Sequence, residues 1–266
     1  MRERILAALV GLLIILPALV FGGTWGAEII IGLVLLIGLD EYAGMAFPGN
    51  KARALGALVP ASVVLYVAVL YGPPGAVTAA AVAVPIFLAL SVLFRPEPVD
   101  TAADAFGRLV LGVVWIPMLF VFLALLRRLE HGMSWVFFTL AVTWLGDTGG
   151  YFGGRFFGKN KLYPKISPKK TWEGVVGGLI FAAIAGCVVK YFGLPELGWV
   201  ECVVLALVLD AFGVLGDLIE SMLKRSFDVK DSGWIMPGHG GILDRIDGVL
   251  FTAPLLYAWI ALAHGV

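Results

Sequence analysis

The chain has 266 residues, of which 60% are hydrophobic and 14% are charged, and its formal net charge is zero. Soluble globular domains are about 45–50% apolar and about 25% charged, so this composition excludes an ordinary soluble protein. The apolar residues form long blocks rather than short alternating runs, which is typical of helices that span a membrane.

The apolar blocks are about as long as a bilayer requires, since its hydrocarbon core needs about 20 residues per helix. Turn-forming residues such as Gly72-Pro73-Pro74-Gly75 separate the blocks. The sequence therefore predicts an all-α, polytopic integral membrane protein with about nine transmembrane helices. The predicted spans are Ile5–Phe21, Ala27–Phe47, Ala54–Tyr71, Ala76–Phe94, Phe106–Leu126, Trp135–Phe152, Gly174–Phe192, Val200–Leu223 and Gly248–Ala263.

The basic residues predict the orientation of these spans. If the N-terminus is cytoplasmic, 16 of the 19 Lys and Arg residues fall on the cytoplasmic side, and only Arg127, Arg128 and Lys190 fall outside. The positive-inside rule therefore favours a cytoplasmic N-terminus and an external C-terminus. We expect one membrane domain, in which residues 1–133 form lipid-facing helices that could build a dimer interface and residues 134–266 carry the catalytic helices and loops.

A basic loop follows the sixth predicted span, at residues 153–174. It could simply attract anionic lipid and fix the topology of the chain. However, the run Ser167-Pro168-Lys169-Lys170-Thr171 supplies two ammonium groups and two hydroxyls just before Glu173-Gly174, where the next helix begins. Such groups at a helix N-terminus suit a polyphosphate ligand. The loop is not a Walker A motif, because no GxxxxGK[ST] string occurs.

The eighth predicted span carries acids and bases on one face. Helical spacing places Asp210 and Asp217 together, and this face continues through Ser221 to Lys224 and Arg225. Ionisable residues in or at the ends of spans are functional or paired by default. Asp210 could alternatively make a polar contact between two helices.

Further carboxylates lie at the start of the last span, where Asp244 and Asp247 are three residues apart. Carboxylates that converge at the mouth of a helix bundle repel one another unless a cation lies between them. A divalent ion held by one or two carboxylates and by substrate phosphates would remove this repulsion.

Three features allow two interpretations each. Asp147 could serve the site or pair with Arg155. His239, in the segment Pro237–Gly241, could be a turn residue or a phosphate donor, and the glycines there let the backbone approach a ligand. Glu41 ends the second span, where we expect a solvated helix end, with the orientation of a basic residue of the site as the alternative.

Two blocks of these residues resemble the signature of the CTP:phosphatidate cytidylyltransferases, the CDP-diacylglycerol synthases. The first block contains Asp147…Tyr151, Gly154-Arg155, Gly158-Lys159 and Ser167-Pro168-Lys169-Lys170-Thr171-x-Glu173-Gly174. The second contains Ser221-x-x-Lys224-Arg225, Lys230-Asp231, Pro237-Gly238-His239-Gly240-Gly241 and Asp244-Arg245-x-Asp247. One departure is Gly150, where that family more often has alanine.

The resemblance implies transfer of CMP from CTP to phosphatidic acid, which releases pyrophosphate and forms CDP-diacylglycerol. It implies Mg²⁺ as cofactor, with a second, monovalent cation as a further option. It also implies a homodimer among the lipids of the bacterial inner (cell) membrane, with the active site on the cytoplasmic side. We expect no nucleic-acid partner.

The resemblance also implies roles for individual residues. Asp217 and Asp244 are expected to bind the metal, with Asp247 and Asp147 assisting. The expected catalytic residues are Asp217, Asp244, Lys224, Arg225 and Arg245. The expected substrate-binding residues are Ser167, Lys169, Lys170, Thr171, Ser221, His239, Gly240 and Gly241.

Two other functions remain as alternatives at this point. A CTP-dependent polyprenol or diacylglycerol kinase would attack the γ-phosphorus and would need a base to activate a hydroxyl. A transporter of anionic substrates would place its polar groups near the midplane of the membrane in repeated halves. The charged residues here are predicted to lie at one membrane face, and no repeat is visible.

Overall fold

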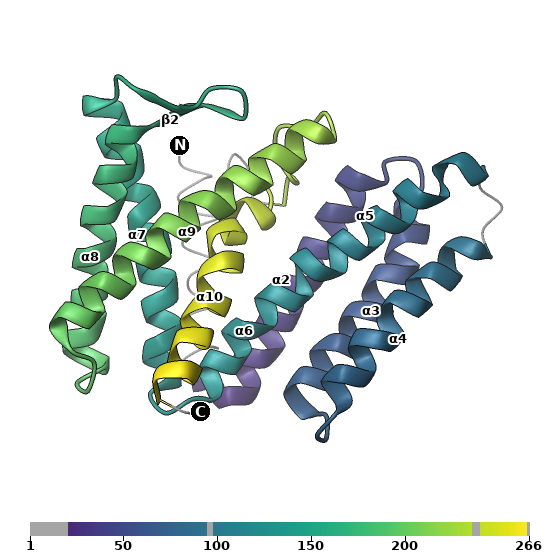
Figure 1. Ribbon diagram of the computed structural model, residues 1–266, viewed down its shortest axis with the longest axis horizontal. Coiled ribbons are helices and arrows are strands. Elements are labelled where there is room, and N and C mark those ends of the chain that lie inside the picture. The colour runs from purple at the N-terminus through teal and green to yellow at the C-terminus, as the bar shows by residue number, and fades with distance from the viewer. Residues whose placement is uncertain (1–20, 95–97, 236–239, 265–266) are drawn as a thin grey trace. The chain divides into compact units, whose positions relative to one another are not determined.

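The computed structural model describes residues 21–94, 98–235 and 240–264 and is almost entirely helical (Figure 1). The predicted span Ile5–Phe21 lies outside these residues except for Phe21. The elements are α2 (Gly23–Ala46), α3 (Lys51–Tyr71), α4 (Ala76–Leu93), η1 (Val99–Thr101), α5 (Ala102–Trp115), α6 (Pro117–Arg128), α7 (Gly132–Phe157), β1 (Lys161–Tyr163), β2 (Ser167–Thr171), α8 (Trp172–Gly193), α9 (Trp199–Ser226) and α10 (Leu243–His264).

Seven helical stretches in the described part of the chain are long and apolar enough to cross a membrane. They are α2, α3, α4, the run Val99–Arg128, α8, α9 and α10. Helix α7 has 26 residues but is not among them, because Asp147 and its many glycine and threonine residues make it less apolar. The prediction of an all-α, polytopic membrane protein is therefore confirmed, while the number of nine spans and their orientation stay predictions.

The span predicted at Phe106–Leu126 consists of two helices rather than one. Helix α5 ends at Trp115, and α6 begins at Pro117. Proline has no N–H to donate, so one helical hydrogen bond is missing at Pro117. Ile116, the residue before it, has a distorted helical backbone with φ −94° and ψ −72°. The break is therefore a local distortion at Pro117.

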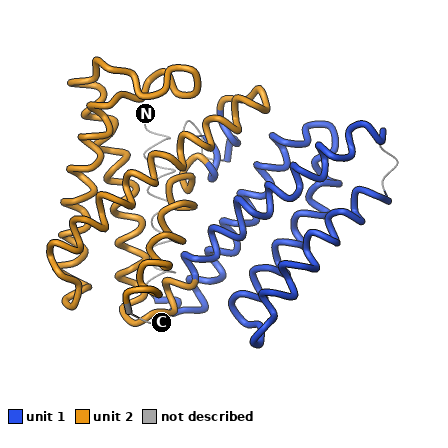
Figure 2. The backbone as a smooth tube through the Cα atoms, in the orientation of Figure 1, with its two compact units in different colours: residues 1–124, 231–243 blue, residues 125–230, 244–266 orange. Residues whose placement is uncertain are grey.

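The chain forms two compact units, which Figure 2 distinguishes by colour. Unit 1 contains residues 1–124 and 231–243, and unit 2 contains residues 125–230 and 244–266. In unit 1, Tyr42 of α2 is fully buried, and its hydroxyl donates a 2.7 Å hydrogen bond to the carbonyl oxygen of Arg108 in α5. A Cβ atom on Gly112 would lie 2.6 Å from the Tyr42 ring, so this glycine lets the two helices approach closely.

In unit 2, glycines bring α7 and α8 into close contact along their length. A Cβ atom on Gly149 would lie 2.5 Å from the carbonyl oxygen of Gly177, and one on Gly177 would lie 2.6 Å from the carbonyl oxygen of Gly149. Small residues that allow backbones to meet are a common means of packing helices in membranes. Helix α9 packs against both helices.

The basic loop between α7 and α8 contains a two-stranded antiparallel hairpin, which the sequence did not predict. Its strands pair Lys161 with Thr171 and Tyr163 with Ser167. Thr171 ends the hairpin and is the N-cap of α8, since its hydroxyl oxygen accepts a 3.1 Å hydrogen bond from the Gly174 amide. The hairpin and the cap together fix the end of the Lys-Lys-Thr run to the start of α8.

Candidate active site

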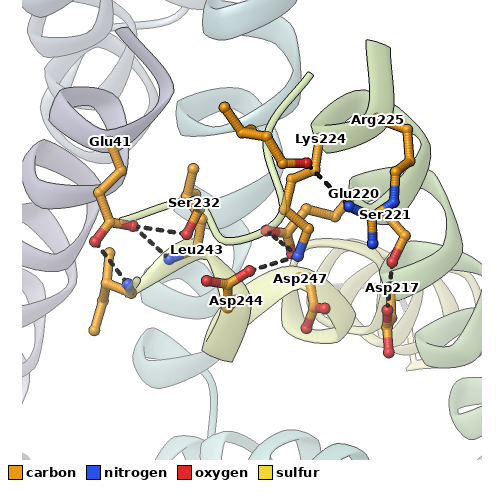
Figure 3. Close-up of polar contacts among 12 residues, drawn as sticks. Glu41, Asp217, Glu220, Ser221, Lys224, Arg225, Ser232, Leu243, Asp244 and Asp247 are labelled. Carbon is orange, nitrogen blue, oxygen red and sulfur yellow. Dashed lines mark hydrogen bonds and ion pairs between the residues drawn. The ribbon is translucent and has the colours of Figure 1, made fainter. Parts of the chain in front are cut away.

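The first acid–base pair in unit 2 joins the hairpin to α9. Lys170 Nζ lies 2.6 Å from Asp217 Oδ2, and each side chain is about one quarter exposed, at 23% and 28%. The other carboxylate oxygen of Asp217 accepts a 3.2 Å hydrogen bond from Ser221 Oγ, one helical turn further along α9 (Figure 3). Asp217 therefore contacts two other residues that the sequence predicted for the site.

The second pair joins α9 to α10 and is more buried than the first. Lys224 Nζ lies 2.5 Å from Asp244 Oδ1 and 3.3 Å from Glu220 Oε1 (Figure 3). The side chains of Lys224, Asp244 and Glu220 are 11%, 12% and 0% exposed. One ammonium group thus lies between two carboxylates. Sequence reasoning assigned no role to Glu220, although its spacing of four residues from Lys224 is the available signal.

Two further carboxylates lie close to these pairs. Asp147 of α7 lies within electrostatic range of Asp217, Lys170 and Arg245. Asp247 of α10 is 9% exposed and lies within electrostatic range of Asp217, Asp147 and Glu220. Helices α7, α9 and α10, together with the hairpin strand β2, therefore bring the four predicted metal-binding acids and two lysines into one region of unit 2.

The donor set in this region fits Mg²⁺, and the fit is centred on Asp217. In the described ranges, no three or more His, Cys, Asp or Glu side chains surround a common point as a preformed metal cage. Mg²⁺ does not require such a cage, because it binds through one or two carboxylates and keeps water or phosphate as its other ligands. Asp217, with Asp147 and Asp247 near it, supplies enough carboxylates. Asp217 and Asp244, the pair expected to share one ion, each contact a different lysine.

The structure places the other predicted residues as follows. Ser167 and Lys169 lie on β2, where Lys169 is exposed. Thr171 is 4% exposed and caps α8. Arg225 Nη1 donates a 3.1 Å hydrogen bond to the carbonyl oxygen of Val229. The side chain of Arg245 is exposed, and the carbonyl oxygen of this residue accepts a 3.2 Å hydrogen bond from Trp144 Nε1.

The predicted glycines of the other unit are Gly240 and Gly241, which belong to unit 1, and His239 lies outside the described residues.

Asp210 is buried among the helices of unit 2, within electrostatic range of Asp147 and Lys170. It is 3% exposed, and its Oδ2 atom has no hydrogen-bond partner among the described residues. A Cβ atom on Gly146 would lie 1.8 Å from Asp210 Oδ1, and one on Gly178 would lie 3.1 Å from Oδ2. The carboxyl group therefore fills the space that two missing side chains leave.

Comparison with known proteins shows the family of this chain. The sequence pattern of the Cytidylyltransferase family matches residues 2–263, which is nearly the whole chain. The chain belongs to the cytidylyltransferase family. It is 34% identical to the phosphatidate cytidylyltransferase of Staphylococcus haemolyticus over 261 residues, which cover 96% of this chain and 97% of that protein. It is 43% identical to the phosphatidate cytidylyltransferase of Bacillus subtilis over 160 residues, which cover 60% of each chain.

Family membership confirms the resemblance that the two sequence blocks indicated. This cytidylyltransferase is a nucleotidyltransferase with several helices able to span a membrane. Lys170 of the first block contacts Asp217, which lies one helical turn before Ser221, the first residue of the second block. Lys224 and Asp244 both belong to the second block. The Lys170–Asp217 contact therefore places the first block next to the helix on which the second block begins.

Proposed function

We propose that this cytidylyltransferase transfers CMP from CTP to phosphatidic acid and releases pyrophosphate and CDP-diacylglycerol. The observation that carries the proposal is the pair of contacts Lys170–Asp217 and Lys224–Asp244 in a helical membrane protein of this family. Two related proteins of similar sequence bear the name of this activity. A lipid phosphate and a nucleotide triphosphate both require cations near the membrane surface, and the two pairs supply them.

The reaction needs little acid–base catalysis. The second pKa of a phosphate monoester is near 6, so the phosphate of phosphatidic acid is largely dianionic at neutral pH and is already a nucleophile. One of its oxygens forms a bond to the α-phosphorus of CTP, and the bond from that phosphorus to the oxygen bridging to the β-phosphorus breaks. Pyrophosphate leaves with the bonding electron pair. The protein mainly has to bring two polyanions together in line and stabilise the charge of the transition state.

The lysines and acids of the site perform these tasks together. Lys170 and Lys224 each hold a phosphate group by charge-assisted hydrogen bonds, while Asp217 and Asp244 keep the ammonium groups in place between turnovers. Arg245 and Lys169, both exposed, supply further positive charge to the triphosphate. Ser221, already bonded to Asp217, orients that carboxylate.

Mg²⁺ is the cofactor that this donor set would hold. Asp217 would be its main protein ligand, assisted by Asp147 or Asp247, and the proximity of these residues supports the assignment. When bound, the ion would supply positive charge to the phosphate oxygens of the triphosphate. The same proposal places the site on the cytoplasmic side of a bacterial inner membrane, where CTP is available, in a homodimer.

Labelled CTP distinguishes this reaction from its nearest rival. The purified protein in detergent is incubated with phosphatidic acid, Mg²⁺ and CTP that carries the label at the α-phosphate. We expect the label to enter the lipid fraction at the rate at which pyrophosphate appears. If the label stays in the nucleotide as CDP, the protein is a kinase, and if all of it stays in CTP, neither reaction occurs; both results would overturn the proposal.

A further inference from the structure

Glu41 of α2 binds a distant segment of unit 1. The prediction of a solvated helix end is wrong for this residue, because its side chain is buried at 7% exposure. Its carboxylate accepts three hydrogen bonds: from the Ile242 amide to Oε1 at 2.9 Å, from the Leu243 amide to Oε2 at 3.0 Å, and from Ser232 Oγ to Oε2 at 3.2 Å. Figure 3 shows the labelled side chains of Glu41 and Ser232 in contact.

The two amide donors belong to the N-terminus of α10, which begins at Leu243. The first amides of a helix have no partner within the helix, and the helix dipole makes that end positive. A carboxylate is therefore a favourable cap there, and the positive end offsets much of the cost of burying its charge. Glu41 is a cap supplied from about 200 residues away in the sequence, since the separations are 201 and 202 residues.

Glycines on both sides of the segment 236–239 make room for this carboxylate. A Cβ atom on Gly233 would lie 2.5 Å from Glu41 Oε1, and one on Gly241 would lie 2.4 Å from Oε2. Real Cβ atoms essentially never lie so close to another heavy atom, so neither position accepts a larger residue unless Glu41 moves. Gly241 belongs to the Pro-Gly-His-Gly-Gly string, and its close approach to Glu41 explains why a residue without a side chain is needed at this position.

From these contacts we infer that Glu41 is a positioning residue for CMP transfer: it holds Ser232 and fixes the start of α10. The inference rests on the proposed function. Asp244, Arg245 and Asp247 lie within the four residues after Leu243, in the first turns of α10, so the position of the α10 N-terminus determines where they lie. A displacement of about 1 Å in a catalytic group can cost about 100-fold in rate.

Glu41→Gln tests the inference, because glutamine keeps the length and shape of the side chain but has one acceptor oxygen instead of two. Asp40→Asn is the matched control: Asp40 is the adjacent acid, but it is 52% exposed and pairs with Lys51 on the surface. We expect Glu41→Gln to lower kcat, measured per folded protein, by about 10- to 100-fold. We expect the KM for CTP to change by less than about threefold, and Asp40→Asn to match the wild type.

Hydrogen exchange distinguishes a local loss of positioning at the start of α10 from a general loss of stability. Amides in a peptide covering residues 240–244 should exchange faster in Glu41→Gln than in the wild type, while peptides from α3 should exchange at the wild-type rate. If Glu41→Gln does not fold, Ser232→Ala removes only the side-chain donor and should lower kcat several-fold. Wild-type kcat in the folded Glu41→Gln variant, or in Ser232→Ala where that is the variant measured, would overturn the inference.

Failure of the proposed function has a different signature. In that case the wild-type protein transfers no label from CTP to lipid, whereas exchange at residues 240–244 still reports whether Glu41 holds the α10 N-terminus. Unchanged exchange in Glu41→Gln would overturn the inference whatever reaction the protein catalyses.

Discussion

Lys224→Met removes the ammonium group that lies between two carboxylates and keeps a side chain of similar length. In the structure this ammonium is 3.3 Å from Glu220 Oε1 and 2.5 Å from Asp244 Oδ1. Glu220 is fully buried, so its carboxylate has no water to replace the lost cation. We expect the variant to be clearly less stable than the wild type.

The size of the effect follows from the burial of the pair. Removing one partner of a buried ion pair costs about 3–5 kcal/mol, because the other charge is left without compensation. We expect the lower end, about 3 kcal/mol, since Asp244 keeps 12% exposure and can regain some hydration. For a chain of this size, 1 kcal/mol corresponds to about 2–4 °C in Tm, so the expected decrease in Tm is roughly 6–12 °C.

Thermal unfolding of the purified protein in detergent measures this decrease. Lys161→Met is the control, because Lys161 is exposed on β1, and its Tm should stay close to that of the wild type. Adding Glu220→Gln to Lys224→Met removes the most buried uncompensated charge and should recover about half of the loss. The reasoning is refuted if Lys224→Met has the wild-type Tm, or if the double variant is less stable than Lys224→Met alone.

Two further predictions concern helix packing and the metal. Gly146→Ala should lower the free energy of unfolding by about 1–3 kcal/mol, because the added Cβ would lie 1.8 Å from Asp210 Oδ1. Gly150→Ala is the control: its Cβ would lie 3.6 Å from the nearest atom, so this variant should be as stable as the wild type or slightly more stable. Equal Tm values for the two variants would contradict this packing. Chelation of divalent ions with EDTA should stop the transfer of labelled CMP, and added Mg²⁺ should restore it; full activity in EDTA would remove Mg²⁺ from the proposal.

Helix positions could largely be predicted from hydrophobicity and from the turn-forming residues between the apolar blocks. The predicted spans Gly174–Phe192 and Val200–Leu223 lie within α8 and α9, because long apolar blocks have few alternatives to a helix in a membrane. In the sequence, Pro117 was also a signal for the point where α5 ends and α6 begins. The hairpin could not be predicted, because its strands are only three and five residues long and do not show the alternation of apolar and polar residues that is typical of strands.

The candidate site could be predicted only in part. Helical spacing indicated the face that carries Asp217, Ser221 and Lys224, and the contacts of these residues agree with it. Spacing does not tell which acid pairs with which lysine, because Lys170–Asp217 and Lys224–Asp244 each join two different elements of the fold. The buried role of Glu41 was beyond reach for the same reason: its partners lie about 200 residues away, at separations of 191 to 202 residues, and nothing local marks it as a helix cap.

The central claim is that the two lysine–carboxylate pairs form the centre of CMP transfer. The most direct test is the rate of label transfer from CTP to phosphatidic acid by Asp217→Asn and Asp244→Asn, with Asp104→Asn as a control on an exposed surface pair with Arg108. Both site variants should fold and should lose about 100-fold or more in rate, while the control keeps the wild-type rate. A wild-type rate in either site variant would contradict the account.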